Sequence, residues 1–208
     1  PKTAKRLYFD VIPKTVDEYL TFAEKLKTET DPEKVLQNPA WHIHAGTAPD
    51  REIPLSFGIL LNLVSVCNTD DRDLLWKFIS RYATGATPET SPYLDKLVGY
   101  AINYYNDFVK PTKSYRAPTE AEQAALKDLR DALSKIAPGT DPSDIQTEVF
   151  TVGKNHNYEN LRDWFKTLYE VLLGQEQGPR MGSFIALYGL DESVALIDRA
   201  LAGEDLSA

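Results

Sequence analysis

The chain has 208 residues, of which 42% are hydrophobic and 26% charged, so the composition is that of a globular protein rather than a disordered one. Its formal net charge is −8, and both halves are acidic, which argues against a protein that coats nucleic acid non-specifically. A single cysteine, Cys67 in an apolar run, excludes an internal disulfide framework and a cysteine-based zinc cluster, and we interpret it as a buried, inert thiol.

The sequence carries no membrane or secretion signal. No apolar stretch approaches the roughly 20 residues that span a bilayer, and the first residues lack a basic start followed by an apolar core. We therefore predict a cytoplasmic protein with no membrane partner. The opening segment PKTAKR reads like a linker, so a fragment of a longer polypeptide is expected.

Apolar residues recur at helical spacing through the first half of the chain. The pattern predicts helices over residues 17–27, 31–37, 54–66, 72–82 and 91–109. The hydroxyl groups of Thr15 and Ser91 are expected to cap two of them. A polar loop is predicted over 41–54, and the only trace of a strand pattern, a weak one, covers Leu7 to Ile12.

The second half shows the same helical period. It predicts helices over residues 119–136, 141–152, 161–173, 183–188 and 193–202, with a loop over 153–157. Pro111 and Pro118 bracket a polar connection, residues 112–117, which we take as the joint between two subdomains. The predicted fold class is all-α, with two helical subdomains over 1–112 and 113–208.

Three long segments carry a resemblance to a known family. They are RLYFDVIPKTVDEYL (6–20), INYYNDFVKPTKSYRAPTE (102–120) and LRDWFKTLYEVLLGQEQGPRMGSFIALYGLDESVALIDRAL (161–201). Together they resemble the C-terminal, anticodon-binding portion of class I lysyl-tRNA synthetases. The resemblance implies helical bundles of the α-helix-cage type shared with glutamyl-tRNA synthetase. Residues 1–112 would form the connecting region and first bundle, and residues 113–208 the terminal, anticodon-binding bundle.

The same resemblance implies what the full chain does and what this part lacks. The full enzyme would attach lysine to its tRNA with Mg-bound ATP, through a catalytic Rossmann domain that lies upstream. This part is expected to bind the lysine tRNA, to hold no cofactor and to be inactive alone. Met181 departs from the aromatic residue that the family favours. An all-helical protein-interaction domain with no RNA function is the alternative, and the acidic composition supports it.

Two histidines, His42 and His44, superficially resemble the HIGH signature of those synthetases. The glycine that should separate the histidines is missing, and no Rossmann strand precedes them, so we predict no nucleotide site. The third histidine, His156, is distant and no carboxylate falls at ligand spacing. We therefore predict neither a metal site nor a catalytic residue, and interpret the pair as loop-packing residues.

Five residues are candidates for contact with tRNA. Lys113, Tyr115 and Arg116 combine cations with an aromatic ring, the pairing that single-stranded RNA requires, although a solvated linker explains them as well. Arg180 lies on a turn that Gly174 opens as a helix C-cap, directly before the next helix. Lys154, near His156 in the expected loop, is the fifth candidate.

Overall fold

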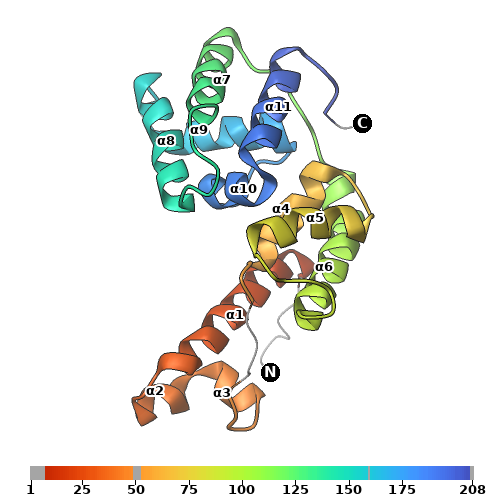
Figure 1. Cartoon of the computed structure of the whole chain (residues 1–208), viewed down its shortest axis with the longest axis vertical. Coiled ribbons are helices and arrows are strands. Elements are labelled where there is room, and N and C mark those ends of the chain that lie inside the picture. Colours follow the sequence, from red (N-terminus) through yellow and green to blue (C-terminus); the bar gives the residue numbers. More distant parts are fainter. Residues whose placement is uncertain (1–7, 49–52, 159, 207–208) are drawn as a thin grey trace, which may run out of the picture. The chain divides into compact units, whose positions relative to one another are not determined.

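A computed structural model describes residues 8–48, 53–158 and 160–206, and every regular element within these ranges is a helix (Figure 1). The predicted all-α class is therefore confirmed. The linker-like start predicted for residues 1–6 lies outside the described residues. The chain divides into two compact units, Pro1–Gly58 and Ile59–Ala208.

The first unit is built on one long helix. The short 3₁₀ helix η1 (Phe9–Val11) leads into α1 (Ile12–Thr28), and α2 (Pro32–Gln37) and α3 (Pro39–Ile43) follow. Helix α3 packs against α1, where Ala23, Leu26 and Ala40 form a small buried core. The half-buried rings of neighbouring aromatic residues cover this core, among them Tyr19, Phe22 and Trp41.

Three expectations for this unit are wrong. Helix α1 begins at Ile12 rather than at residue 17, because Pro13 fits the first turn of a helix; Thr15 therefore lies inside the helix and caps nothing. The described part of the weak strand pattern forms η1 and the start of α1. The predicted 41–54 loop begins late, because Asn38 caps α3 by accepting from the Ala40 amide at 2.9 Å.

The start of α4 (Phe57–Cys67) depends on a residue forty positions away. The Asp17 carboxylate of α1 accepts hydrogen bonds from the amides of Phe57 at 2.6 Å and Gly58 at 3.0 Å. These amides would otherwise lack partners at a helix N-terminus. The helix therefore begins three residues after the predicted start at residue 54. Burial raises the pKa of Asp17, and the two amide bonds oppose this shift.

The second unit contains the remaining helices in two runs. The first run continues α4 through α5 (Arg72–Tyr82), α6 (Pro92–Tyr104), the π-helix η2 (Tyr105–Val109) and the 3₁₀ helix η3 (Lys110–Thr112). The second run comprises α7 (Glu120–Leu133), α8 (Pro142–Asn155), α9 (Leu161–Leu168), the π-helix η4 (Tyr169–Leu173), α10 (Met181–Tyr188) and α11 (Leu190–Leu201).

Most helices of this unit match the periodicity within a few residues, and the differences lie at their ends. The predicted helices over 91–109 and 161–173 each finish as a π-helix instead of a continuous α-helix. Ser91 precedes α6, but its side chain makes no capping bond. Helix α8 extends to Asn155. Of the loop expected over 153–157, only residues 156 and 157 therefore lie outside the helix. Gly174 ends η4 with φ +66°, as the C-cap prediction required.

A single large core holds α7–α11 together. Buried residues from all of these helices contribute, including Leu129, Val149, Trp164, Leu172, Phe184 and Ile197. Helix α10 approaches α8 closely because Gly182 has no side chain: a Cβ there would lie 2.1 Å from the Pro142 carbonyl oxygen. Met181, at the start of α10, is buried in this core and so presents no surface to a ligand.

Cys67, at the end of α4, is a free cysteine whose burial raises its pKa to about 12. A thiol with so high a pKa stays protonated at neutral pH, and the thiolate is the reactive form. The interpretation of Cys67 as an inert residue therefore agrees with its surroundings.

The connection expected between the two runs is present as a non-helical segment over residues 113–119. It lies inside the second unit, so the compact units separate at Gly58 and not at this connection. Arg81 of α5 links the two runs as well: it pairs with Glu192 at 2.7 Å and donates to the Tyr188 carbonyl at 2.6 Å. The assignment of two subdomains over 1–112 and 113–208 stays a prediction.

Candidate nucleic-acid interface

Helix α9 presents two different faces. The inner face buries Trp164, whose indole N–H donates to the Val149 carbonyl at 2.9 Å. Trp164 fits against α8 because Gly153 has no side chain: a Cβ there would lie 2.5 Å from the indole ring. The outer face carries residues at positions i, i+3, i+4 and i+7 of the helix, which share one side. They are Arg162, Phe165, Lys166 and, in the first turn of η4, Tyr169.

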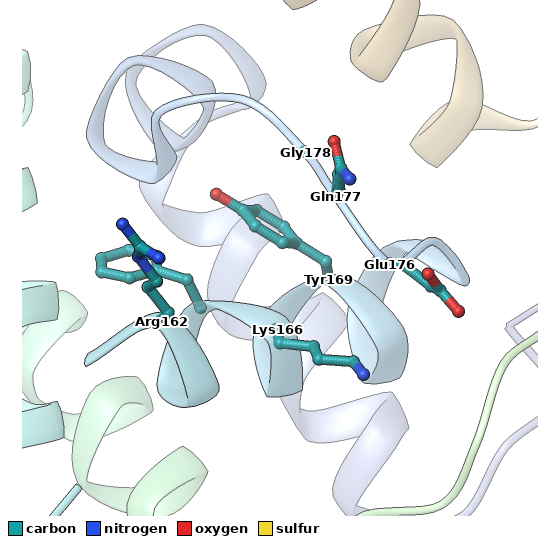
Figure 2. Close-up of a pocket in the computed structure, with 7 residues that line it drawn as sticks. Arg162, Lys166, Tyr169, Glu176, Gln177 and Gly178 are labelled. Atoms are coloured by element: carbon teal, nitrogen blue, oxygen red, sulfur yellow. The ribbon is translucent and has the colours of Figure 1, made fainter. Parts of the chain in front are cut away.

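These outer residues line a pocket of about 380 Å³ together with Glu176, Gln177 and Gly178 of the following turn (Figure 2). Tyr169 points toward the segment that carries Gln177 and Gly178. Its hydroxyl donates to the Pro179 carbonyl at 2.7 Å. A Cβ at Gly178 would lie 2.5 Å from the Tyr169 ring, so glycine lets the backbone approach this closely. The turn is thus held against the tyrosine.

A row of three aromatic rings runs from α8 across this face. Phe150, which is 37% exposed, meets Phe165 edge to face with ring centroids 5.1 Å apart. Phe165 in turn lies 6.4 Å from Tyr169, centroid to centroid. The edge-to-face contact with Phe150 holds the Phe165 ring in a defined orientation, and the Tyr169 ring is held by its hydroxyl and by Gly178. The surface therefore offers π-systems in fixed positions beside a pocket.

Cations surround the aromatic row, and we call the set of Phe150, Phe165, Tyr169, Arg162 and Lys166 the α9 face. Arg162 is exposed, and its guanidinium makes no ion pair or hydrogen bond with the part of the chain that the structure describes. Lys166 is paired with Glu170 at 3.4 Å but keeps 55% of its side chain exposed. The face thus carries positive charge on an otherwise acidic chain.

Two of the predicted tRNA contacts border this face. Lys154 is exposed one helical turn after Phe150 on α8, and Arg180 is exposed directly after Pro179, whose carbonyl receives the Tyr169 hydroxyl. Neither side chain has an ion-pair partner among the described residues. Both are therefore available to a ligand that lies on the α9 face.

The other three predicted contacts lie in the connection between the two runs, where each has an internal partner. The Lys113 ammonium donates to the Ser65 carbonyl at 2.7 Å and lies 4.9 Å from the centre of the Tyr115 ring. Burial lowers the pKa of Lys113 to about 8. Tyr115 packs on Gly174, where a Cβ would lie 2.9 Å from its ring, and burial raises the pKa of its phenol.

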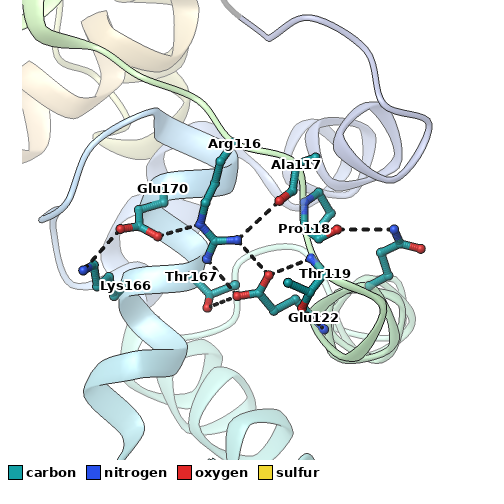
Figure 3. A network of polar contacts seen from close by, with 9 residues as sticks. Arg116, Ala117, Pro118, Thr119, Glu122, Lys166, Thr167 and Glu170 are labelled. Atoms are coloured by element: carbon teal, nitrogen blue, oxygen red, sulfur yellow. Dashed lines mark hydrogen bonds and ion pairs between the residues drawn. The ribbon is translucent and has the colours of Figure 1, made fainter.

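Arg116 is the centre of a polar network (Figure 3). Two of its nitrogens donate to the Glu122 carboxylate at 2.7 Å each, and its Nε donates to Glu170 at 2.6 Å. Thr167 adds a hydrogen bond to Glu122 at 2.8 Å. The Arg116 hydrogen bonds lower the pKa of Glu122 to about 2 and also lower the pKa of Glu170. The guanidinium is therefore used in joining α7 and η4 to the connection.

The structure thus leaves Lys154 and Arg180 exposed, each close in sequence to residues of this surface, and places Lys113, Tyr115 and Arg116 in a half-buried joint between the two runs. Sequence reasoning missed the outer residues of α9. A signal for them exists: the amphipathic pattern of 161–173 leaves two aromatic residues, Phe165 and Tyr169, on the polar side beside two cations. Partly exposed aromatic residues at helical spacing are the feature to look for.

The histidine pair makes unrelated contacts. The His42 Nε2 donates to the Leu36 carbonyl at 2.7 Å, and the His44 Nε2 lies 2.8 Å from the Tyr19 hydroxyl. The two rings therefore have different partners. Within residues 8–48, 53–158 and 160–206, no group of three or more His, Cys, Asp or Glu side chains is arranged as a metal site. In the same ranges, no helix is both long and apolar enough to cross a membrane.

By fold, the chain is an all-α protein that gathers cations and aromatic rings on one face of its second unit. Comparison with known proteins identifies its relatives. It is 52% identical over 202 residues to a lysine–tRNA ligase of Rickettsia felis, which covers 97% of this chain and 38% of the relative. The corresponding ligases of Rickettsia akari and Rickettsia bellii are 52% and 51% identical and cover 95% and 97% of the chain. No protein-family model matches it.

The resemblance to lysyl-tRNA synthetases is therefore confirmed: the chain is a relative of part of the lysine–tRNA ligases. It spans about two-fifths of the length of the Rickettsia proteins, 38% in the first case.

Proposed function

We propose that this chain is the tRNA-binding part of a lysine–tRNA ligase and that it holds the anticodon arm against the α9 face. The observation that supports the proposal is the row of fixed aromatic rings beside unpaired cations, in a chain half-identical to lysine–tRNA ligases. Single-stranded RNA loops are recognised by this combination, because cations attract phosphates and aromatic rings stack on unpaired bases.

The charge distribution limits how the RNA binds. The net charge of −8 repels phosphates from most of the surface, so productive contact is confined to the few cations around the α9 face. We therefore expect modest affinity and a shallow dependence on salt. With about −0.7 per neutralised phosphate on single-stranded RNA, the total slope of log affinity against log salt would be near −2 to −4.

The five predicted contacts divide into two roles in this proposal. Lys154 and Arg180 touch the RNA, as do Arg162 and Lys166. Lys113, Tyr115 and Arg116 instead support the surface, because their charges and rings are engaged inside the joint beneath α9. A phosphate contact from Arg116 would require breaking three short hydrogen bonds to carboxylates.

The chemistry of aminoacylation is assigned to another part of the ligase. In the proposal, ATP with Mg²⁺ and lysine bind an upstream catalytic domain of the same chain. The part described here recognises the tRNA through its anticodon. The contacts of His42 and His44 with Leu36 and Tyr19 support this division, since a nucleotide site of the HIGH type would need both rings directed at one ligand. Purified chain is accordingly expected to show no lysine-dependent pyrophosphate exchange.

The test is fluorescence titration of the chain with labelled anticodon stem-loops, one from the lysine tRNA and one with a changed anticodon. Wild-type protein should bind the lysine loop more tightly, with the shallow salt slope given above. Lys154→Ala removes a phosphate-binding lysine and should lower the affinity for both stem-loops alike. Arg180→Ala should cost about 1–3 kcal/mol for the lysine loop if the arginine reads a base, and should reduce the discrimination between loops.

Lys96→Ala is the matched control, because Lys96 is an exposed lysine on α6, outside the α9 face. It should bind both loops as wild type does. If wild-type protein binds neither loop at any salt concentration, the proposed function is wrong.

A second candidate function rests on a separate observation in the first unit. Leu36 and Ile43 are 59% and 66% exposed, although both are large apolar residues. They belong to neighbouring short helices that the His42–Leu36 hydrogen bond joins. Exposed apolar residues of this kind favour a contact with another protein surface. This candidate gains if the chain binds no RNA.

A further inference from the structure

The pocket of the α9 face combines features that the cations alone do not explain. Beside the helix runs a segment without regular secondary structure, residues 177–180, that follows the glycine turn. The backbone N–H and C=O groups of Glu176, Gln177 and Gly178 have no hydrogen-bond partner in the part of the chain that the structure describes. A backbone with open donors and acceptors can pair with the edge of a nucleobase, which also carries donors and acceptors.

The two aromatic side chains of the pocket, Tyr169 and Phe165, are held by different contacts. Tyr169 is fixed at both ends, because its hydroxyl binds the Pro179 carbonyl and Gly178 packs on its ring. Tyr169 therefore forms one side of the pocket and keeps residues 177–180 in place. Phe165 also lines the pocket; its ring is partly buried against the core and meets Phe150 of α8 edge to face, and no hydrogen bond or glycine contact with the turn covers it among the described residues. Phe165 is thus the ring on which a planar ligand would stack.

The charges around the pocket indicate on which side a phosphate of the ligand would lie. Arg162 precedes Phe165 by one helical turn and is unpaired among the described residues. On the opposite side, Glu176 points away from Tyr169 (Figure 2) and Lys166 is partly neutralised by Glu170. A phosphate attached to a ligand in the pocket would therefore lie on the Arg162 side.

We propose that the pocket takes one unstacked base of single-stranded RNA, stacked on Phe165, with its edge toward residues 176–178 and its phosphate toward Arg162. The proposal rests on the proposed function, since the RNA is the anticodon loop that the α9 face binds. It goes further in assigning a single base to this open pocket and separate tasks to Arg162, Phe165 and Tyr169. Base stacking on an aromatic side chain contributes enough to be measured for one residue.

The test is a double-variant cycle between the protein and the RNA. Each loop position of the lysine anticodon stem-loop is replaced in turn by an abasic nucleotide, and each RNA is titrated against wild type and Phe165→Leu. Removal of the stacking ring should lower affinity for the intact loop about 5- to 150-fold. At one loop position the abasic change and Phe165→Leu should be strongly non-additive, because each removes the same contact.

Tyr100→Leu on α6 is the matched control, because Tyr100 is a 60% exposed aromatic residue outside the pocket. It should bind every loop as wild type does. A second measurement uses only wild-type protein, so that it does not depend on the folding of a variant. Loops with 5-iodouracil at single positions are irradiated, and the peptide that becomes linked is identified by mass spectrometry. One position should link to Phe165 or Tyr169.

The outcomes separate the two proposals. If wild type binds the lysine loop but every abasic change is additive with Phe165→Leu and no peptide of α9 is linked, the single-base pocket is wrong and the proposed function stands. If wild type binds no loop, both proposals fail. An acidic peptide that competes for the pocket while no RNA does so would likewise overturn the inference.

Discussion

At the scale of single residues, the partners of a charge decide what it can do. Arg116 and Arg162 are both arginines near α9, yet Arg116 donates to Glu122 and Glu170 while Arg162 has no partner among the described residues. Arginine binds carboxylates and phosphates with the same planar fork of donors. The residue whose donors already bind carboxylates has a structural role, and the residue whose donors are open is available to bind a ligand.

The Arg116 network predicts a specific dependence of stability on pH. The folded protein holds the pKa of Glu122 at about 2, below its ordinary value of 4.5, because Arg116 stabilises the carboxylate. The contribution of Glu122 to the free energy of unfolding is therefore complete above pH 4.5 and is lost as the pH falls toward 2. Glu122→Gln should be less stable than wild type at pH 7 and should lose less stability over this window.

Urea unfolding at a series of pH values measures both effects. The control is Glu148→Gln, since Glu148 is exposed on α8 and outside the network. It should retain the wild-type slope. Equal losses of unfolding free energy in wild type and Glu122→Gln between pH 4.5 and 2 would show that Arg116 does not hold this carboxylate.

At the scale of helices, interior stretches follow the local pattern and helix ends follow their neighbours. The periodicity predicts α5 over residues 72–82, and the helix has these bounds because Asp71 supplies a local cap for the amides of Asp73 and Leu74. By contrast, α4 begins where the Asp17 carboxylate meets it. A cap within four residues is visible in the sequence, whereas one that is forty residues distant is not.

The end of η4 offers a test of how tightly the glycine turn packs. Gly174 and Gly203 both have positive φ, at +66° and +73°, so alanine strains the backbone at either position. Only at Gly174 would the added methyl group meet a side chain, at 2.9 Å from the Tyr115 ring; at Gly203 the space is open. Gly203→Ala should cost about 1 kcal/mol. Gly174→Ala should cost about 1–3 kcal/mol more.

Thermal or urea unfolding of the two variants gives the comparison, and their difference removes the backbone contribution that they share. If Gly174→Ala is no less stable than Gly203→Ala, then Tyr115 does not pack on the turn as described.

At the scale of the whole molecule, the connection over residues 113–119 links the two helix runs of the second unit. It is a polar, non-helical segment of the kind that proteases cut first. Here it is fastened at several points: Lys113 to Ser65, the Ser114 amide to the Gly174 carbonyl at 2.9 Å, and Arg116 to Glu122 and Glu170. We therefore expect the joint to resist cleavage as long as these contacts hold.

Limited trypsin digestion tests this expectation, because Lys113 and Arg116 are potential cleavage sites within the connection. The double variant Glu122→Gln, Glu170→Gln keeps both sites and removes the ion pairs of Arg116. It should be cut after Arg116 several-fold faster than wild type. Cleavage after Lys135, which is exposed beyond the end of α7, serves as the internal control and should be unchanged. Equal rates at Arg116 in both proteins would contradict the clamped joint.

The candidate site was predictable only in part, for a physical reason. Lys154 and Arg180 were predicted as tRNA contacts from local signals, a cation near a loop and a glycine turn before a helix, and they stay predictions. The pocket itself joins α9 to residues 176–178, and its shape depends on the Tyr169–Pro179 hydrogen bond and the absence of a side chain at Gly178. No local spacing shows that Lys113 turns inward to Ser65, forty-eight residues earlier in the chain.

The sequence by itself determined the all-α class, the approximate position of nearly every helix and the relation to lysine–tRNA ligases. Helical period and capping act over a few neighbouring residues, and a relation to other proteins follows from comparing the sequences alone. Only the tertiary structure decided where α4 begins, which arginine is free and which aromatic rings gather beside it. These outcomes depend on burial and on hydrogen bonds between distant segments, which form only when the chain has packed.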